Sequence, residues 1–330
     1  MASTIQNFAS QYSFYANLIT TSTAIFGNIL NLLIFTKLKI FRDNRCIFYL
    51  TIESISNLIN QLFTLIINIL PKIYGYDITS YSLTWCRIKN MIYQIANLIT
   101  LSMVCFAAVD QFFSTNYRLH LRQLCTFKLA QCFVFASIFI WFMHSLLYSF
   151  YTAVNPSFGC ILSNQIWIAY TTYFFFPVIA GFLPILTASL FSLLAYGNVR
   201  RIIRRQVTIE RRRFDRQITA MILIRVILFV IVTFPYTCYK IYSNNISSKN
   251  VDALRAAIER LIQVFIYSFC NLNYAVNFYL FFISSSRYRR QVKYVLKKKY
   301  WRQIINWCCH NENQIQPENT LVSDENIVDE

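Results

Sequence analysis

The sequence predicts an all-α membrane protein built as a bundle of seven transmembrane helices. Charge is scarce: 56% of the 330 residues are hydrophobic and only 14% are charged, against about 25% charged in a typical soluble domain. The charges are also unevenly placed, because none occurs from Met1 to Thr36 or between Lys128 and Arg200. Such segments cannot form a water-soluble surface, but they suit contact with lipid. The third observation is the number of apolar runs.

Seven runs reach the roughly 20 mostly apolar residues that a helix needs to cross a bilayer. They are approximately Tyr15–Phe35, Cys46–Leu70, Asn90–Phe113, Leu129–Tyr151, Trp167–Tyr196, Ile218–Tyr242 and Leu261–Ile283. The long uncharged stretch after Lys128 divides at Asn155–Gly159, where an Asn-Pro-Ser-Phe-Gly segment has the composition of a turn. We therefore expect two spans there instead of one.

The basic residues predict the orientation of the spans. Of the 31 Lys and Arg residues, 23 fall in the first and third loops, in the segment from Arg200 to Arg216, and in the segment from Arg287 to Arg302. Seven fall in the loops on the opposite side. The positive-inside rule then places the amino terminus outside and the carboxyl terminus inside the plasma membrane. We interpret the net charge of +17 as a sign of this topology and not of nucleic-acid binding.

The predicted organisation has four parts. Residues 1–14 form an extracellular amino terminus, residues 15–285 hold the seven helices, residues 286–309 form an amphipathic cytoplasmic helix, and residues 310–330 form a polar, disordered tail. In the third part, apolar residues recur at helical spacing among Lys and Arg, as in a helix lying on the inner membrane surface. A solvated basic tail is the alternative. Cys308 and Cys309 in this region are possible palmitoylation sites.

Residues at particular spacings in these runs resemble those of rhodopsin-like (class A) G protein-coupled receptors. The resemblance extends from about Phe26 to Arg290, and the joint order of the matches makes it specific. The matching elements, in chain order, are Gly27-Asn28, Cys86, Asp110, Trp141, Pro184, Phe234-Pro235-Tyr236 and Asn277-Phe278-Tyr279-Leu280-Phe281. The resemblance implies a receptor that binds an extracellular ligand and signals to a heterotrimeric G protein.

The chain is an atypical member by this resemblance. Gln111 replaces the Arg of the family's Asp-Arg-Tyr motif, Asn57 replaces the sodium-binding Asp, and Thr233 replaces a frequent Trp. Phe278 and Phe281 replace the Pro and Tyr of the Asn-Pro-x-x-Tyr motif. Asp110 and Asp215 stand at the two acid positions that the missing Arg would contact. The departures concern the residues expected to carry activation and G protein coupling, and they leave the predicted fold unaffected.

The resemblance also implies a disulfide and a ligand pocket. It pairs Cys86 with Cys160, which ties the third span to the second outer loop; two free thiols are the alternative. It places the pocket among the outer halves of the third, fifth, sixth and seventh spans, with packing or interfacial roles as the alternative for about half of its residues. The expected pocket residues are Tyr93, Gln94, Asn97, Tyr173, Tyr236, Tyr239, Gln263 and Tyr267.

Tyr93 stands where amine receptors have an Asp, and Asn271 stands where opsins have the retinal Lys. These two positions speak against an amine ligand and against a retinal cofactor. We expect no cofactor and no metal, since the ten cysteines show no paired CxxC spacing. A peptide-like ligand is the default.

Buried polar residues form the last group. Asn28, Asn57, Asn273 and Asn277 fall in apolar spans, where they need partners. A shared network and separate local hydrogen bonds are both open. Arg225 lies within the sixth span and is expected either to pair inside the bundle, with Asp110 as a candidate, or to reach cytosolic water.

Three functions compete. A coupling receptor is the leading hypothesis, with Arg225 or the Arg211–Arg213 cluster supplying the positive charge that Gln111 lacks. A ligand-binding or scavenger receptor that does not couple is the second, favoured by Gln111. A channel or transporter is the third, but only Glu53 and Arg225 lie clearly within spans, and such proteins need more ionisable groups. No arrangement of the three His residues suggests an enzyme. Asn245 begins a glycosylation sequon in an outer loop.

Overall fold

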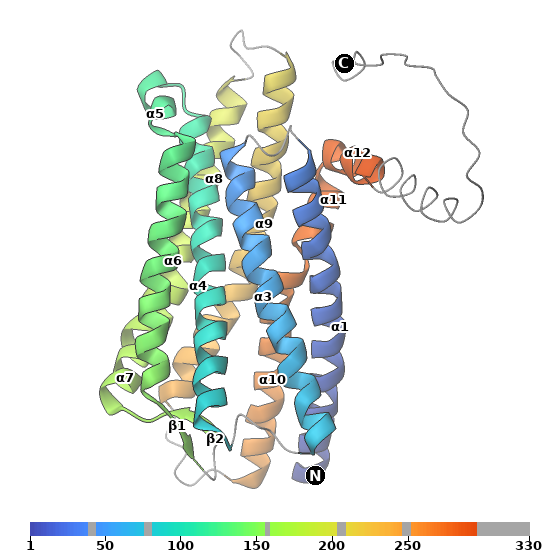
Figure 1. The fold of residues 1–330 in the computed structure, drawn as a ribbon, viewed down its shortest axis with the longest axis vertical. Helices are drawn as coiled ribbons and strands as arrows, with labels where there is room; N and C mark the ends of the chain where they lie inside the picture. Colours follow the sequence, from blue (N-terminus) through green and yellow to red (C-terminus); the bar gives the residue numbers. More distant parts are fainter. Residues whose placement is uncertain (39–43, 76–80, 156–158, 203–208, 246–251, 296–330) are drawn as a thin grey trace, which may run out of the picture. The chain divides into compact units, whose positions relative to one another are not determined.

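The computed structural model describes residues 1–38, 44–75, 81–155, 159–202, 209–245 and 252–295 of the chain. The chain divides into two units, Met1–Arg289 and Arg290–Glu330, and the first unit holds the helical bundle. Among the described residues, the bundle consists of seven helical passes that alternate in direction (Figure 1).

Most of the passes are single helices, but two are composite. The single-helix passes are α1 (Ala2–Lys37), α3 (Arg45–Tyr74), α4 (Leu83–Ser114), α6 (Phe127–Phe150) and α9 (Ile209–Asn245). The first composite pass, which lies between α6 and α9 in the chain, consists of α7 (Gln165–Tyr170), η2 (Thr171–Phe182) and α8 (Leu183–Ile202). The second composite pass consists of α10 (Ala253–Ala275) and α11 (Asn277–Ser284). A short helix, α5 (Leu119–Leu124), connects α4 to α6.

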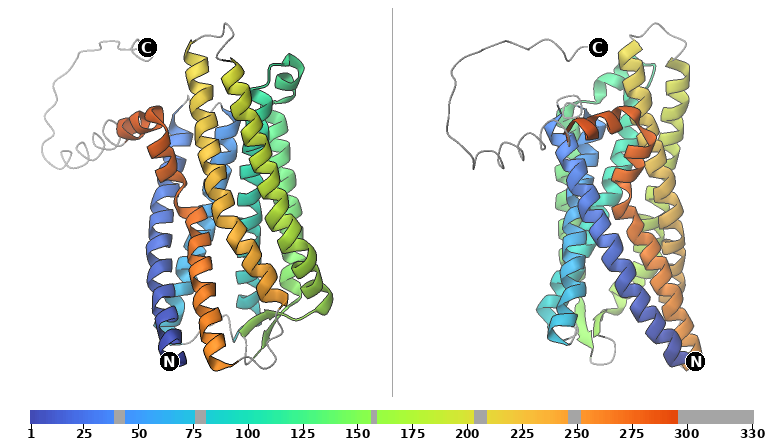
Figure 2. Two further views of the ribbon diagram at one scale, coloured as in Figure 1. Left: turned by 180° about the vertical axis from the view of Figure 1, so that it is seen from behind. Right: turned by 90° about the vertical axis from the view of Figure 1, so that its right-hand side faces the viewer.

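Six of the passes are long and apolar enough to cross a membrane, which confirms the prediction of an all-α membrane protein. The seventh pass, α10 with α11, lies beside α1 (Figure 2). It is more polar because the first turns of α10 carry Arg255, Glu259 and Arg260. Large apolar side chains on the outer faces of the bundle are exposed, for example Phe135 (69%) and Phe139 (67%) on α6. Lipid is the environment in which such a surface is stable.

Capping residues explain where three of the helices begin. Asn44 accepts a hydrogen bond from the backbone N–H of Ile47, and Ser82 and Thr126 cap α4 and α6 in the same way. A side-chain oxygen at this position satisfies a backbone donor that has no partner within the helix.

The start of α1 differs from the sequence-based expectation. Residues 1–14, expected to form a separate amino-terminal segment, are helical from Ala2 and continuous with the first span.

The outer loop between α6 and α7 contains a small β-hairpin that the sequence did not predict. Strands β1 (Thr152–Asn155) and β2 (Gly159–Leu162) pair antiparallel, with Val154 opposite Cys160. Gly159 has φ 70°, a left-handed conformation that glycine adopts without steric cost. The two strands thus end and begin on either side of the expected turn, whose residues 156–158 lie outside the described residues.

Two irregular helical segments shape the interior. The π-helix η2 contains Pro177, and Gly181 near its end lies against α9: a Cβ added there would be 2.5 Å from Thr237 Cγ2 and 2.6 Å from Phe176 O. The absence of a side chain at Gly181 therefore lets α9 approach η2 closely. The second segment is the break at Val276, between α10 and α11, which is flanked by buried Asn273 and Asn277.

The helix α12 (Ser286–Tyr294) follows α11 directly. It covers the start of the amphipathic helix expected over residues 286–309. Tyr288 in its first turn is buried and donates a hydrogen bond to Asn31 Oδ1 at 2.5 Å. The remainder of that predicted helix and the tail over residues 310–330 lie outside the described residues.

Candidate ligand cavity and buried polar clusters

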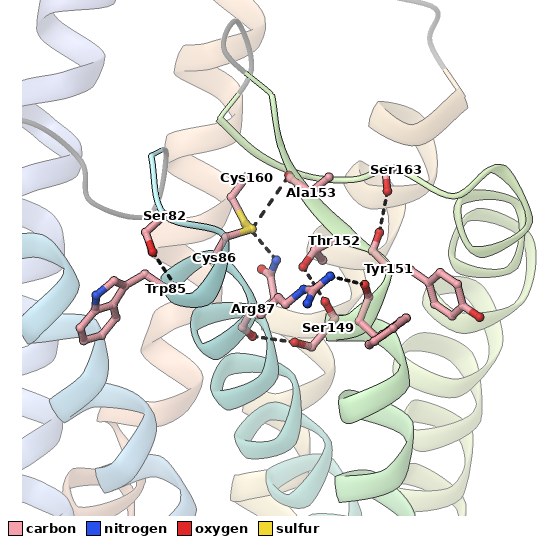
Figure 3. Close-up of a disulfide and its surroundings, with 12 residues drawn as sticks. Ser82, Trp85, Cys86, Arg87, Ser149, Tyr151, Thr152, Ala153, Cys160 and Ser163 are labelled. Atoms are coloured by element: carbon pink, nitrogen blue, oxygen red, sulfur yellow. Dashed lines mark hydrogen bonds between the residues drawn. A yellow bond between two sulfur atoms is a disulfide. The ribbon is translucent and has the colours of Figure 1, made fainter.

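A disulfide joins Cys86 at the start of α4 to Cys160 in β2, with 5.5 Å between the two Cα atoms. The predicted pairing is thus confirmed. Figure 3 shows the contacts that hold the hairpin and the end of α6 to α4. The Arg87 guanidinium donates to Phe150 O at 3.1 Å, and Ser149 Oγ donates to Arg87 O at 2.9 Å. These contacts fix the hairpin over one end of the bundle.

A cavity of about 380 Å³ opens among the helices at this end. Its size falls within the range typical of small-molecule sites, and its lining mixes aromatic and polar groups as such sites do. The lining residues come from α3, α4, η2, α9 and α10, and they are Asn60, Thr64, Asn90, Tyr93, Asn97, Leu101, Ala180, Thr233, Tyr236, Lys240, Tyr267, Cys270, Asn271, Asn273 and Tyr274. Asn90 also links the cavity to the disulfide, because its Nδ2 donates to Cys160 Sγ at 3.2 Å.

Four of the eight expected pocket residues line this cavity: Tyr93, Asn97, Tyr236 and Tyr267. The other four lie elsewhere among the described residues. Gln94 contacts His144 at 3.3 Å, between α4 and α6, and Tyr173 is 71% exposed. Tyr239 packs against Tyr242 and Tyr267. Gln263 accepts a hydrogen bond from Arg260 at 2.9 Å. Tyr173 lies in the π-helix, whose wider turn directs side chains to faces that an α-helical alignment does not predict.

Lys240 is the lining residue that sequence reasoning missed. Its ammonium lies 5.1 Å from the ring centroid of Tyr267, 5.3 Å from that of Phe176 and 5.9 Å from that of Tyr236. In the sequence it was counted only as one of seven outer basic residues. Its position five residues after Pro235, close to the expected pocket tyrosines, was the signal that could have identified it.

A second site, which we call the buried ionic cluster, lies deeper in the bundle and consists of Glu53, Arg225, Asn273 and Asn277. Arg225 on α9 donates to Glu53 Oε1 on α3 through Nε at 2.9 Å and Nη2 at 2.5 Å. Its Nη1 donates to Asn273 Oδ1 at 2.7 Å, and Asn277 Nδ2 donates to the same Glu53 oxygen at 2.8 Å. The side chains of Arg225 and Glu53 are 1% and 0% exposed. One ion pair therefore connects α3, α9 and both halves of the seventh pass.

Arg225 therefore pairs inside the bundle, as the first expectation had it, but its partner is Glu53 and not the candidate Asp110, and the alternative of reaching cytosolic water is wrong. The sequence contained the signal for the correct partner. Glu53 and Arg225 are the two charges that lie clearly within the predicted spans, and an intramembrane charge usually pairs with an opposite one. Asp110 is a candidate only through its place in the family motif.

The expected amide network is only partly present. Asn273 and Asn277 meet through Glu53 and Arg225, as described above. Asn57 accepts a hydrogen bond from Thr100 Oγ1 at 2.8 Å, and Asn28 donates to the backbone oxygens of Ala24 and Tyr274. Within the described residues, Asn28 and Asn57 thus use separate local partners.

A third site, the inner polar cluster, lies at the end of the bundle opposite the cavity and includes Arg45, Cys46, Asp110, Gln111 and Cys125. Arg45 Nε lies 3.2 Å from Asp110 Oδ1, and its Nη1 donates to Cys125 O. Cys46 Sγ lies 3.2 Å from Asp110 Oδ2 and 3.1 Å from Gln111 Oε1. Burial, and after it the Asp110 carboxylate, raises the pKa of Cys125 to about 12.

Gln111 itself joins two helices in this cluster. Its Nε2 donates to Thr219 Oγ1 on α9 at 2.6 Å. The cation beside Asp110 is therefore Arg45, at the start of α3. The contact that Gln111 makes between α4 and α9 is a neutral hydrogen bond. Sequence reasoning expected that cation from Arg225 or from Arg211–Arg213. The side chains of Arg211–Arg213 lie outside the described part of the chain.

The remaining predicted residues divide between described and undescribed positions. Phe278 and Phe281 are buried and pack against Tyr288, with ring centroids 6.0 Å and 6.1 Å away. The side chains of Asp215 and Asn245 lie outside the described part, as do Cys308 and Cys309.

Comparison with known proteins identifies the broad class. Residues 160–299, which begin in β2 and extend past the end of α12, match the model of a family described as serpentine-type seven-transmembrane G protein-coupled chemoreceptors, Srw. A search of curated proteins found no match. Over residues 160–299, which make up less than half of the chain, the protein is similar to seven-transmembrane G protein-coupled chemoreceptors. The matched region contains Arg225 and the cavity-lining residues of η2, α9 and α10, whereas those of α3 and α4 lie outside it.

Proposed function

We propose that this receptor is a rhodopsin-like chemoreceptor at the plasma membrane, which binds an extracellular ligand in the cavity and signals to a heterotrimeric G protein. The observation that carries the proposal is the cavity itself. It is lined by five helical elements, is linked to the disulfide-bonded hairpin through Asn90, and has both polar and aromatic lining groups. The similarity to the Srw chemoreceptors supports the same function.

The orientation belongs to the same proposal. Disulfides persist in oxidising compartments, so the Cys86–Cys160 end of the bundle faces outward. The charge distribution independently favours an amino terminus on that side and a carboxyl terminus inside. The cavity then opens to the exterior, and the inner polar cluster faces the cytosol.

The structure offers a route by which the ligand could affect the inner face. Asn273 lines the cavity and also accepts a hydrogen bond from Arg225. A ligand that contacts Asn273 therefore acts one hydrogen bond away from the ion pair that joins α3 to α9. A ligand shifts a receptor toward its active state only by binding that state more tightly, and this contact supplies a means of doing so.

A direct test is a ligand screen in transfected cells with G protein dissociation as the readout, supported by a binding assay on the purified receptor. Compounds that bind in the cavity should promote dissociation, and Asn273→Ala should reduce their potency. A receptor that binds ligands without any G protein response would support the alternative, a non-coupling scavenger receptor. Gln111 favours that alternative, because it is engaged with Thr219 and carries no charge for a G protein contact.

A further inference from the structure

The cavity has an unusual electrostatic composition: one cation and no acid. Lys240 is the only ionisable lining residue with a permanent charge at neutral pH, and none of the described lining residues is Asp or Glu. The described residues also contain no carboxylate in an ion pair with Lys240, whose recorded contacts are the three aromatic rings of Phe176, Tyr236 and Tyr267. A cation-carrying ligand would thus meet repulsion without a counter-charge.

Two phenol groups stand beside this cation. The rings of Tyr236 and Tyr267 are 5.7 Å apart, and both line the cavity with Lys240. Within the described parts of the chain, neither hydroxyl makes a hydrogen bond to a protein group, and both side chains line the cavity. A buried or half-buried phenol normally finds a partner, so both hydroxyls are available as donors to a ligand.

We infer that Lys240, Tyr236 and Tyr267 form an anion-binding subsite that takes a single carboxylate of the ligand. This inference rests on the proposed function and specifies its ligand. A lone ammonium with two hydroxyl donors matches one negative charge, whereas phosphate and other polyanions are usually bound by several cations or by forked guanidinium groups. The rings that surround the ammonium limit its hydration, which strengthens its attraction to an anion.

The rest of the cavity indicates what accompanies the carboxylate. The lining also includes the amides of Asn60, Asn97 and Asn273 and the apolar side chains of Leu101 and Ala180. A volume of about 380 Å³ suits a small organic acid or the carboxyl end of a short peptide. Both sources present the same carboxylate, and the experiment distinguishes them.

The test measures the thermal stability of the purified receptor with matched pairs of compounds. One arm uses small monocarboxylic acids and their primary amides, and the other uses tripeptides with free or amidated carboxyl ends. A stabilising acid whose amide is inactive is the expected result in at least one arm. Lys240→Met keeps the aliphatic stem and should weaken binding of that acid by about 10- to 100-fold, the loss expected for a charged hydrogen bond.

Two controls separate charge from structure. Arg260→Met removes an exposed cation near the start of α10 and should leave acid binding unchanged. Lys240→Arg retains the charge and should retain most of the preference for acid over amide. If Lys240→Met lowers the melting temperature without ligand, the Lys240→Arg result decides between a structural and a binding role.

Several outcomes would overturn the inference. One is that no acid stabilises the wild-type receptor, and another is that acids and amides stabilise it equally. Undiminished acid binding in Lys240→Met would also refute it. A neutral ligand that activates G protein through the cavity would refute the anion subsite while leaving the proposed receptor function intact. An acid that binds through Lys240 without activating G protein would support the anion subsite and count against the proposed signalling function.

Discussion

Removing the charge of Glu53 should destabilise the receptor strongly, because it leaves Arg225 as a buried cation without a counter-charge. Glu53→Gln nearly preserves the shape of the side chain, and Asn273 remains the only other described partner of the guanidinium. Breaking a buried pair by changing one partner costs about 3–5 kcal/mol. We therefore expect the melting temperature of the purified receptor to fall by on the order of 10 °C.

A double-mutant cycle shows whether this loss arises from the pair itself. Arg225→Met removes the cation and keeps an unbranched apolar chain, so the double variant Glu53→Gln/Arg225→Met should regain most of the stability lost in Glu53→Gln. The coupling energy should reach about 2 kcal/mol. Asp110→Asn with Arg225→Met is the matched control, and its effects should add within about 0.5 kcal/mol, since Asp110 pairs with Arg45. Additive effects for Glu53 and Arg225, or coupling between Asp110 and Arg225, would refute the assigned pairing.

Three further predictions concern orientation, the disulfide and a thiol. An epitope inserted between residues 205 and 210 should be stained only after permeabilisation, and staining of intact cells would contradict the proposed topology. Cys86→Ser should lower surface expression, with the Cys86→Ser/Cys160→Ser double variant no worse than the single one; clearly additive losses would argue against the bond. Because its pKa is raised to about 12, Cys125 should remain a thiol at pH 8 and react slowly with iodoacetamide, as followed by peptide mapping. Asp110→Asn removes one cause of that shift and should speed the reaction, whereas rapid labelling of the wild-type thiol would contradict the prediction.

The fold was largely predictable because the bilayer imposes a simple rule on composition. Long apolar runs, basic residues between them and turn residues at 155–159 are local features of the chain, and the structure has helices at all seven runs. The hairpin and the π-helix were not predictable, because each depends on contacts made after folding. The disulfide tethers the former, and the close approach of α9 at Gly181 accompanies the latter.

The site was less predictable, because its chemistry depends on residues far apart in the sequence. Glu53 and Arg225 are separated by 172 positions, so no spacing rule connects them. Lys240 resembled any other outer basic residue until the folded chain placed three aromatic rings around it. Motif similarity identified the third, fifth, sixth and seventh spans as walls of the cavity but missed the contribution of α3. Which side chains of each helix enter the cavity depends on the rotation of that helix about its axis.

The central claim is that a ligand in the cavity activates a G protein although Gln111 replaces the usual Arg. GTPγS binding to G protein, measured in membranes that contain the receptor and a ligand with demonstrated binding, tests it most directly. The ligand should raise nucleotide exchange in the wild-type receptor, and Gln111→Arg should change basal or ligand-driven exchange by several-fold, on the scale of one charge-assisted hydrogen bond. If ligand is bound but exchange stays at background in both the wild type and Gln111→Arg, the receptor does not couple, and the scavenger function replaces the one proposed here.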